Sequence, residues 1–498
     1  MRLYAAFAAF SFMCVYAFRD WYRAALFLVL TMAVVERPDF PKQILGIPGM
    51  NPWNVLLLCT VMAFMISKPE DRPPIGGGIK FLIFFYLGVI VIAFLREFND
   101  MTGLIEFAEY LGAEPIGKMG LIIDDLINTL KYVAPGVLVY LGCNSYERVR
   151  EAIWAVILMN CMLAALAVKS MGFDALGSGT ELEQTAIRRL DRDTGYFRSD
   201  LAILFAGSSW AIFAYSRFVL NIPFRWLLFA GSILCAMAIG LSGGRMGMAA
   251  WGVLGFVFGV IRWPRILLIG PLIALAIFAT VPAVQERLLQ GFDGEDEKHA
   301  SVEDYGLAPS DSDVNLNSVT SGRVIIWPHV LEKIGESPFL GYGRRAMQRI
   351  GLSMQMAVDY DKPFAHPHNA YLQLFLDNGL LLGFPVLLFH LLVLKYSIQM
   401  TRDKSQPIFP LVGSISLAFS LSFLVGSFAQ QSFYPFISSV SMWVAIALML
   451  RIRAEQRALV RSEASAATPA FRFAANAVSK VRERQGSGYE SWLVARST

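Results

Sequence analysis

Long apolar runs are the feature that most restricts how this chain can fold. Runs of membrane-helix character recur from residue 3 to residue 450, and the longest interruption is residues 285–369. A helix needs about 20 apolar residues to cross a bilayer, so the runs predict an all-α polytopic membrane protein with roughly 12 or 13 transmembrane helices and one large loop. Hydrophobic residues make up 55% of the 498 residues and charged residues 16%, which excludes a soluble enzyme.

Basic residues between the runs predict the orientation of the chain. Short basic pairs, such as Arg19 with Arg23, recur at the same end of successive helices if the helices alternate in direction. Under the positive-inside rule that end faces the cytoplasm, and residues 285–369 are then exported. The orientation of the N-terminus stays open. The net charge of +4 is small and dispersed, which gives no support to nucleic-acid binding.

These features divide the chain into four parts. They are N-terminal transmembrane helices with short loops over 1–284, a large exported loop over 285–369, C-terminal transmembrane helices over 370–452, and a basic cytoplasmic tail over 453–498. Within the loop, the acidic residues 293–313 predict an irregular linker. Residues 324–334 predict an amphipathic helix with Trp327, Leu331 and Ile334 on one side.

Two of the five histidines stand where the polar loop gives way to an apolar run. His366 and His368 precede this run, and Pro367 and Asn369 suit the entry to a helix. The positive end of the helix dipole favours neutral imidazole at His368, which can accept a proton. Histidine at the mouth of a membrane helix usually has a partner or a function.

Three exported arginines are candidates for binding phosphate. Arg245 ends a Ser-Gly-Gly-Arg turn at 242–245, Arg323 ends Thr-Ser-Gly-Arg at 320–323, and Arg192 belongs to a basic patch. A guanidinium grips phosphate oxygens with two parallel hydrogen bonds, so these residues could hold a diphosphate leaving group. Arg245 also fits an interfacial charge after a glycine turn, and Arg323 a solvated residue at a helix start.

The arginines can hold the diphosphate leaving group, and a neutral histidine can take the proton from the incoming sugar hydroxyl. Together they supply what a metal ion would supply in a soluble sugar-nucleotide transferase. We therefore predict a site that uses no metal and no cofactor. Tyr342, Tyr371 and Asn369 are the candidate contacts for a sugar or an acceptor.

Several motifs in order resemble the O-antigen ligase and polymerase family. His-Asn-Ala-Tyr-Leu at 368–372, followed by Asn378-Gly379, is similar to the motif that closes the family's large periplasmic loop. Pro-Phe-Leu-Gly-Tyr-Gly at 338–343 resembles the stretch before it, and 242–245 resembles an earlier Ser-x-x-Arg turn, although the family's turn often has Ser directly before Arg. The resemblance covers roughly residues 190–385.

The resemblance implies a GT-C-like membrane glycosyltransferase at the periplasmic face of the bacterial inner membrane. Such enzymes transfer a glycan from undecaprenyl diphosphate to a hydroxyl of lipid A core, of another lipid-linked repeat unit, or of a protein. Carried over to this chain, Arg245 and Arg323 bind the diphosphate; Arg192 stays a candidate only through the basic patch at 188–198, which could attract phosphates or merely be solvated. His368 is the catalytic base, and His366 shares or orients it.

Two other classes of function remain open at this point. A transporter of an anion would have charged groups at mid-membrane and broken helices in paired halves, which the sequence does not show clearly. A non-catalytic scaffold for polysaccharide export would not depend on His368.

Overall fold

The computed structural model describes residues 2–44, 46–47, 49–67, 76–172, 177–289, 323–361, 363–430 and 433–466. Regular structure in these residues is helical, apart from an isolated bridge between Ile44 and Ile47. The all-α prediction is therefore confirmed. The predicted acidic linker at 293–313 and the tail beyond residue 466 lie outside the described residues.

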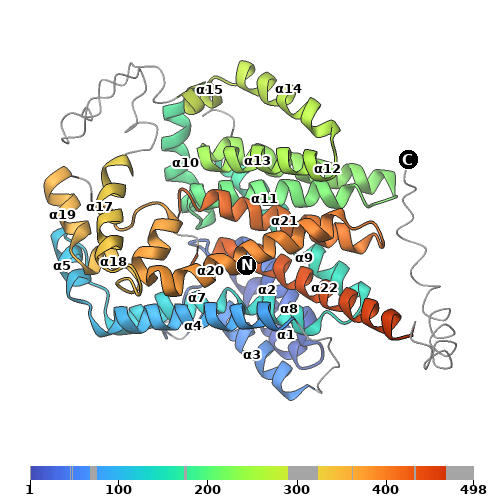
Figure 1. The fold of residues 1–498 in the computed structure, drawn as a ribbon, viewed down its shortest axis with the longest axis horizontal. Coiled ribbons are helices and arrows are strands. Elements are labelled where there is room, and N and C mark those ends of the chain that lie inside the picture. The colour runs from blue at the N-terminus through green and yellow to red at the C-terminus, as the bar shows by residue number, and fades with distance from the viewer. Residues whose placement is uncertain are drawn as a thin grey trace.

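The helices run along the whole described chain (Figure 1). The first half holds α1 (Arg2–Ala17), α2 (Trp21–Val35), α3 (Pro52–Ile66), α4 (Gly77–Asn99), α5 (Thr102–Tyr110), α6 (Lys118–Leu121), the π-helix η1 (Ile122–Ile127), α7 (Asn128–Lys131), α8 (Ala134–Gly142), α9 (Tyr146–Met171), α10 (Gly179–Thr194), α11 (Arg198–Ser216) and α12 (Ile222–Ser242). The second half holds α13 (Arg245–Ile261), α14 (Arg265–Thr280), α15 (Pro282–Leu289), α17 (Arg323–Glu336), α18 (Ala346–Arg349), α19 (Leu352–Tyr360), α20 (Ala370–Arg402), α21 (Ile408–Gly426), the 3₁₀-helix η4 (Ile437–Ser439) and α22 (Val440–Ala466).

Six segments of the described chain are long and apolar enough to span a membrane, so this is a multi-pass membrane protein. They are Gly77–Asn99, Tyr146–Met171, Ile222–Ser242, Ala370–Arg402, Ile408–Gly426 and Ile437–Ala458, and the sharply bent pair α14 and α15 makes a seventh if it counts as one span. Shorter apolar helices are Phe7–Ala17, Trp21–Val35, Pro52–Ile66 and Arg245–Ile261. The sequence predicts 12 or 13 spans because it counts such short runs as full crossings.

Helix α11 lies at the centre of the bundle. It packs against α12, α13 and α21, and nearly all of its side chains are buried. Small residues allow the close approach, because a Cβ on Gly244 or Gly247 of the α13 entry would collide with Ala202 of α11. This contact fixes the N-terminus of α13 beside the N-terminus of α11.

A second, smaller hydrophobic core lies under α17, α18 and α19. Ile326 and Val330 are fully buried there against Met347, Met356 and Leu376. The predicted helix at 324–334 is confirmed as α17, but its predicted face is wrong at one position.

That position is Leu331, which is 56% exposed. Ile326, Val330 and Ile334 follow at intervals of four and form the stripe that faces the small core, with Trp327 partly buried beside it. The apolar residues of α17 allow more than one stripe, and the neighbours from α18, α19 and α20 select this one.

Helix α20 is broken at Gly379, and the loop before α18 fills the break. Gly379 has φ 63° and ψ −176°, a backbone conformation that side chains disfavour. The amide nitrogens of Leu380 and Leu381 donate to the carbonyl oxygens of Pro338 and Phe339, at 2.6 and 3.0 Å. In return, the Tyr342 amide nitrogen donates to the Leu376 carbonyl at 2.9 Å. The loop thus satisfies backbone groups that the break would leave unpaired.

Replacing Gly379 with alanine is expected to destabilise the protein by roughly 2–5 kcal/mol, from a strained φ and a collision with the Phe339 carbonyl. Thermal unfolding of the purified chain in detergent measures this loss. The matched control is Gly335→Ala in α17, where a Cβ meets nothing within 4 Å and φ is ordinary. Equal stability of the two variants would contradict a structural role for the break.

Candidate functional site

Four helix N-termini carry arginine or histidine and lie close enough to interact. Arg198 is the first residue of α11, Arg245 of α13 and Arg323 of α17, and the two histidines precede α20. Burial lowers the pKa of both histidines and of Arg323; the charge of Arg323 adds to this effect at the histidines, and the charges of Arg245 and Arg198 add to it at Arg323. Helix N-termini carry partial positive charge, so the arrangement favours an anion. We call these residues, with Glu183 and Arg287, the arginine–histidine site.

Glu183 of α10 joins two of these arginines. Its carboxylate accepts hydrogen bonds from the guanidinium groups of Arg198 and Arg287. Arg287, from α15, is 5% exposed and also contacts the Gly243 carbonyl at 3.4 Å between Nη2 and O. Glu183 also interacts electrostatically with Arg245. Among the described residues, the site therefore combines four arginines with one carboxylate and carries net positive charge.

The sequence did not single out Glu183 or Arg287. Glu183 stands on a polar helix among six other charged residues, and Arg287 follows an apolar run within the expected loop. Arg198 could be predicted only as one member of the basic patch at 188–198.

The two histidine rings are in contact, with their planes tilted by 48°. Their centroids are 4.0 Å apart, and the His368 amide nitrogen donates to His366 Nδ1 at 3.2 Å. That hydrogen bond places the proton of neutral His366 on Nε2. His368 itself has φ 49°, a strained conformation of the kind that concentrates at functional sites.

Neighbouring elements hold the histidine segment in place. The Trp327 indole Nε1 of α17 donates to the Pro367 carbonyl at 3.0 Å. The Asn369 side chain caps α20 by accepting from the amides of Tyr371 and Leu372, at 3.0 and 3.2 Å. The segment is therefore fixed both by the extramembrane core and by the helix it begins.

Burial, and to a smaller extent the nearby Arg323 charge, together lower the pKa of His368 to about 4. Burial, His368 and Arg323 lower the pKa of His366 to about 3. Both rings are therefore neutral at pH 7, the form that can accept a proton. The dipole of α20 alone predicts the neutral form of His368. Burial and the Arg323 charge favour the neutral form further.

The low histidine pKa predicts an unusual pH profile for any reaction that uses His368 as a base. The base form exists above the pKa, so kcat/KM, which reports the free protein, should stay nearly level from pH 8 to pH 5.5. A histidine with the ordinary pKa of about 6.5 would leave only about a tenth of kcat/KM at pH 5.5. A bound diphosphate would raise the pKa, so kcat should fall at higher pH than kcat/KM. A fall of kcat/KM centred near pH 6.5 would contradict the geometry.

Arg192 is not brought to the arginine–histidine site. It stands nine positions after Glu183, which places it on the opposite face of α10 and about 13 Å along the helix. Its side chain is 68% exposed and its Nε pairs with Asp193 Oδ1 at 2.8 Å. The basic patch of the sequence therefore divides between α10, which carries Arg192, and α11, whose first residue Arg198 belongs to the site.

The predicted sugar contacts have other partners in the structure. The Tyr371 hydroxyl donates to the Leu424 carbonyl at 2.8 Å, and its ring packs on Phe428. The Tyr342 hydroxyl donates to Glu336 Oε2 at 3.2 Å. Asn369 caps α20 as described above. These contacts serve the packing of α20, α21 and the loop, and the roles in sugar binding stay predictions.

Comparison with known proteins bears on the same stretch of chain. Residues 230–387 match the family described as O-antigen ligase, and this segment contains Arg245, Arg287, Arg323, His366 and His368. Residues 230–387 form an O-antigen ligase family domain. The recognised family domain therefore supplies both histidines and three of the four arginines, while Arg198 and Glu183 come from helices before it.

A curated relative points in the same direction. A protein of Rickettsia conorii (strain ATCC VR-613 / Malish 7), named as a candidate polysaccharide ligase, is 28% identical over 137 residues. The match covers 26% of this chain and 32% of the relative, so the chain spans about a third of the relative's length.

Proposed function

We propose that the protein transfers a glycan from undecaprenyl diphosphate to an acceptor hydroxyl at the periplasmic face of the bacterial inner membrane. The observation that carries this proposal is the meeting of several arginines with two neutral histidines at converging helix N-termini. The O-antigen ligase family domain and the naming of the R. conorii relative support it.

In this proposal Arg245 and Arg323 bind the diphosphate of the donor. Within the described part of the chain, Arg323 makes no ion pair, and its neighbours Arg245 and Arg198 repel its charge. An incoming diphosphate would relieve this repulsion and gain charge-assisted hydrogen bonds. Arg198 and Arg287 are bound to Glu183, so their part is to hold α10, α11 and α15 together at the site.

His368 is the proposed base. As the acceptor oxygen attacks the anomeric carbon of the donor, the hydroxyl proton passes to the neutral His368 ring. The bond between that carbon and the diphosphate oxygen breaks, and undecaprenyl diphosphate leaves with its negative charge held by the arginines. His366 carries its proton on Nε2 and accepts from the His368 backbone through Nδ1, so its part is to orient the segment.

The arginines supply the positive charge that a divalent ion supplies in many sugar transferases. We therefore expect transfer to be unchanged by an excess of chelator over the divalent metal in the assay. Restoration of a chelator-sensitive rate by added Mg²⁺ or Mn²⁺ would contradict the proposed absence of a metal.

Removal of the gene from its native host separates the possible acceptors. Accumulation of long glycans on the carrier lipid, with loss of the mature product, would indicate a ligase whose acceptor is lipid A core. Accumulation of single repeat units would indicate a polymerase whose acceptor is another lipid-linked unit. Normal surface polysaccharide with no lipid-linked intermediate would overturn the proposal.

A further inference from the structure

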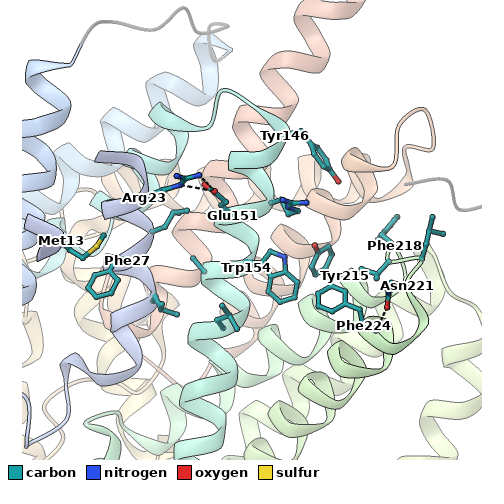
Figure 2. Close-up of a pocket in the computed structure, with 17 residues that line it drawn as sticks. Met13, Arg23, Phe27, Tyr146, Glu151, Trp154, Tyr215, Phe218, Asn221 and Phe224 are labelled. Carbon is teal, nitrogen blue, oxygen red and sulfur yellow. Dashed lines mark hydrogen bonds and ion pairs between the residues drawn. The ribbon is translucent and has the colours of Figure 1, made fainter. Parts of the chain in front are cut away.

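A cavity of about 780 Å³ lies at the other end of the bundle from the arginine–histidine site. It is bounded by α1, α2, α9 and the connection from α11 to α12 (Figure 2). Helix α11 runs from Arg198 at the arginine–histidine site to Tyr215 at the cavity, and its 19 residues span about 28 Å. The two sites therefore lie at opposite ends of α11.

The lining changes from polar to apolar along two helices. On α2 it passes from Arg23 to Leu26 and Leu30, and on α9 from Arg150 to Leu158. Trp154, Phe27 and Phe224 add aromatic surface in the same space (Figure 2). A cavity that is apolar for two helical turns and polar at one end fits an amphipathic ligand whose chain lies between the helices.

The polar end carries net positive charge. Arg23 pairs with Glu151 at 2.8 Å between Nη2 and Oε1 and lies 3.7 Å from Asp20 Oδ2, and its side chain is 50% exposed. Arg150 and Tyr146 line the same end. Among the residues that line the cavity, two arginines, Arg23 and Arg150, stand against one carboxylate, Glu151.

We propose that this cavity binds an anionic phospholipid, with one acyl chain between α2, α9 and α12 and the phosphate at Arg23 and Arg150. The positive charge at the polar end of the cavity favours an anionic headgroup, because a zwitterionic lipid would place its choline group next to arginines. The sequence-based orientation puts this end on the cytoplasmic side, where the ligand would come from the inner leaflet. The inference does not depend on the proposed transferase activity.

Lipid binding to the purified full-length chain in neutral detergent tests this site. Native mass spectrometry would count bound phosphatidylglycerol and, in a parallel titration, phosphatidylcholine with the same acyl chains. We expect at least tenfold tighter binding of phosphatidylglycerol. Leu158→Trp, which fills the cavity from a lipid-exposed position, and Arg150→Gln should each remove that preference.

Arg225→Gln is the matched control, because Arg225 lies at the same end of the bundle but outside the cavity lining. It should bind phosphatidylglycerol as the unmodified chain does. Equal binding of the two phospholipids, or equal losses in Arg150→Gln and Arg225→Gln, would overturn the proposal. Tighter binding of undecaprenyl phosphate than of phosphatidylglycerol would also overturn it, because the cavity would then belong to the carrier lipid.

Discussion

Replacement of His368 by asparagine is expected to reduce glycan transfer by roughly 10²- to 10⁴-fold, the usual effect of removing a general base. Asparagine suits this test better than alanine, since it tolerates the positive φ of 49° at this position and so preserves the backbone. Transfer of glycan from the lipid carrier in membranes that contain equal amounts of protein measures the loss.

His329→Asn is the control for the histidine prediction. His329 lies on α17 within the same extramembrane core and contacts the Tyr360 hydroxyl at 3.3 Å. Its replacement should leave transfer within a few-fold of the unmodified protein. Comparable losses in both variants would point to damage of the extramembrane core and would remove the support for His368 as the base.

Arg323→Gln and Arg245→Gln are each expected to lower kcat/KM by roughly 10²- to 10³-fold, because each removes charge at the developing diphosphate leaving group. The loss should fall mainly on kcat if the contact strengthens as the bond breaks, and on KM if it serves only binding. Inhibition by inorganic diphosphate gives a second measure, and both variants should need higher concentrations of it.

Arg192→Gln provides the matched control for the arginines. Arg192 is exposed, pairs with Asp193 and faces away from Glu183, so its replacement should change neither kcat/KM nor inhibition by diphosphate. A loss in Arg192→Gln as large as that in Arg323→Gln would mean that general basic charge, and not the arginine–histidine site, attracts the donor.

Much of the fold can be predicted from local patterns in the sequence. The apolar runs predict the helices, and Pro367 with Asn369 predicts the entry to α20, where Asn369 does cap the helix. If successive helices alternate in direction, Arg245, Arg323 and the two histidines are predicted to lie on the same side of the membrane. These features depend on residues that are neighbours in the chain, which is why periodicity and charge reveal them.

The remaining features depend on contacts between distant segments. Glu183 belongs to the site only because α10, α11 and α15 meet there. Arg192 lies outside the site because it is on the opposite face of α10. In the sequence, Gly379 and Gly341 look like close-packing or turn residues. In the structure, the lack of a side chain at each glycine lets the backbone of the segment that contains the other glycine come close. No local pattern predicts these partners. The described residues hold six or seven segments long enough to span, against 12 or 13 predicted, because a short apolar run looks alike in sequence whether it crosses a membrane or ends within the bundle.

The most direct measurement is single-turnover transfer by the purified full-length chain in vesicles, with an undecaprenyl-diphosphate-linked glycan as donor and chelator present. We expect undecaprenyl diphosphate to appear in step with the glycosylated acceptor in the unmodified chain. His368→Asn should give neither product while still binding the donor. Normal release of undecaprenyl diphosphate by His368→Asn, or no transfer by the unmodified chain with either lipid A core or a second lipid-linked unit as acceptor, would contradict a transferase centred on the arginine–histidine site.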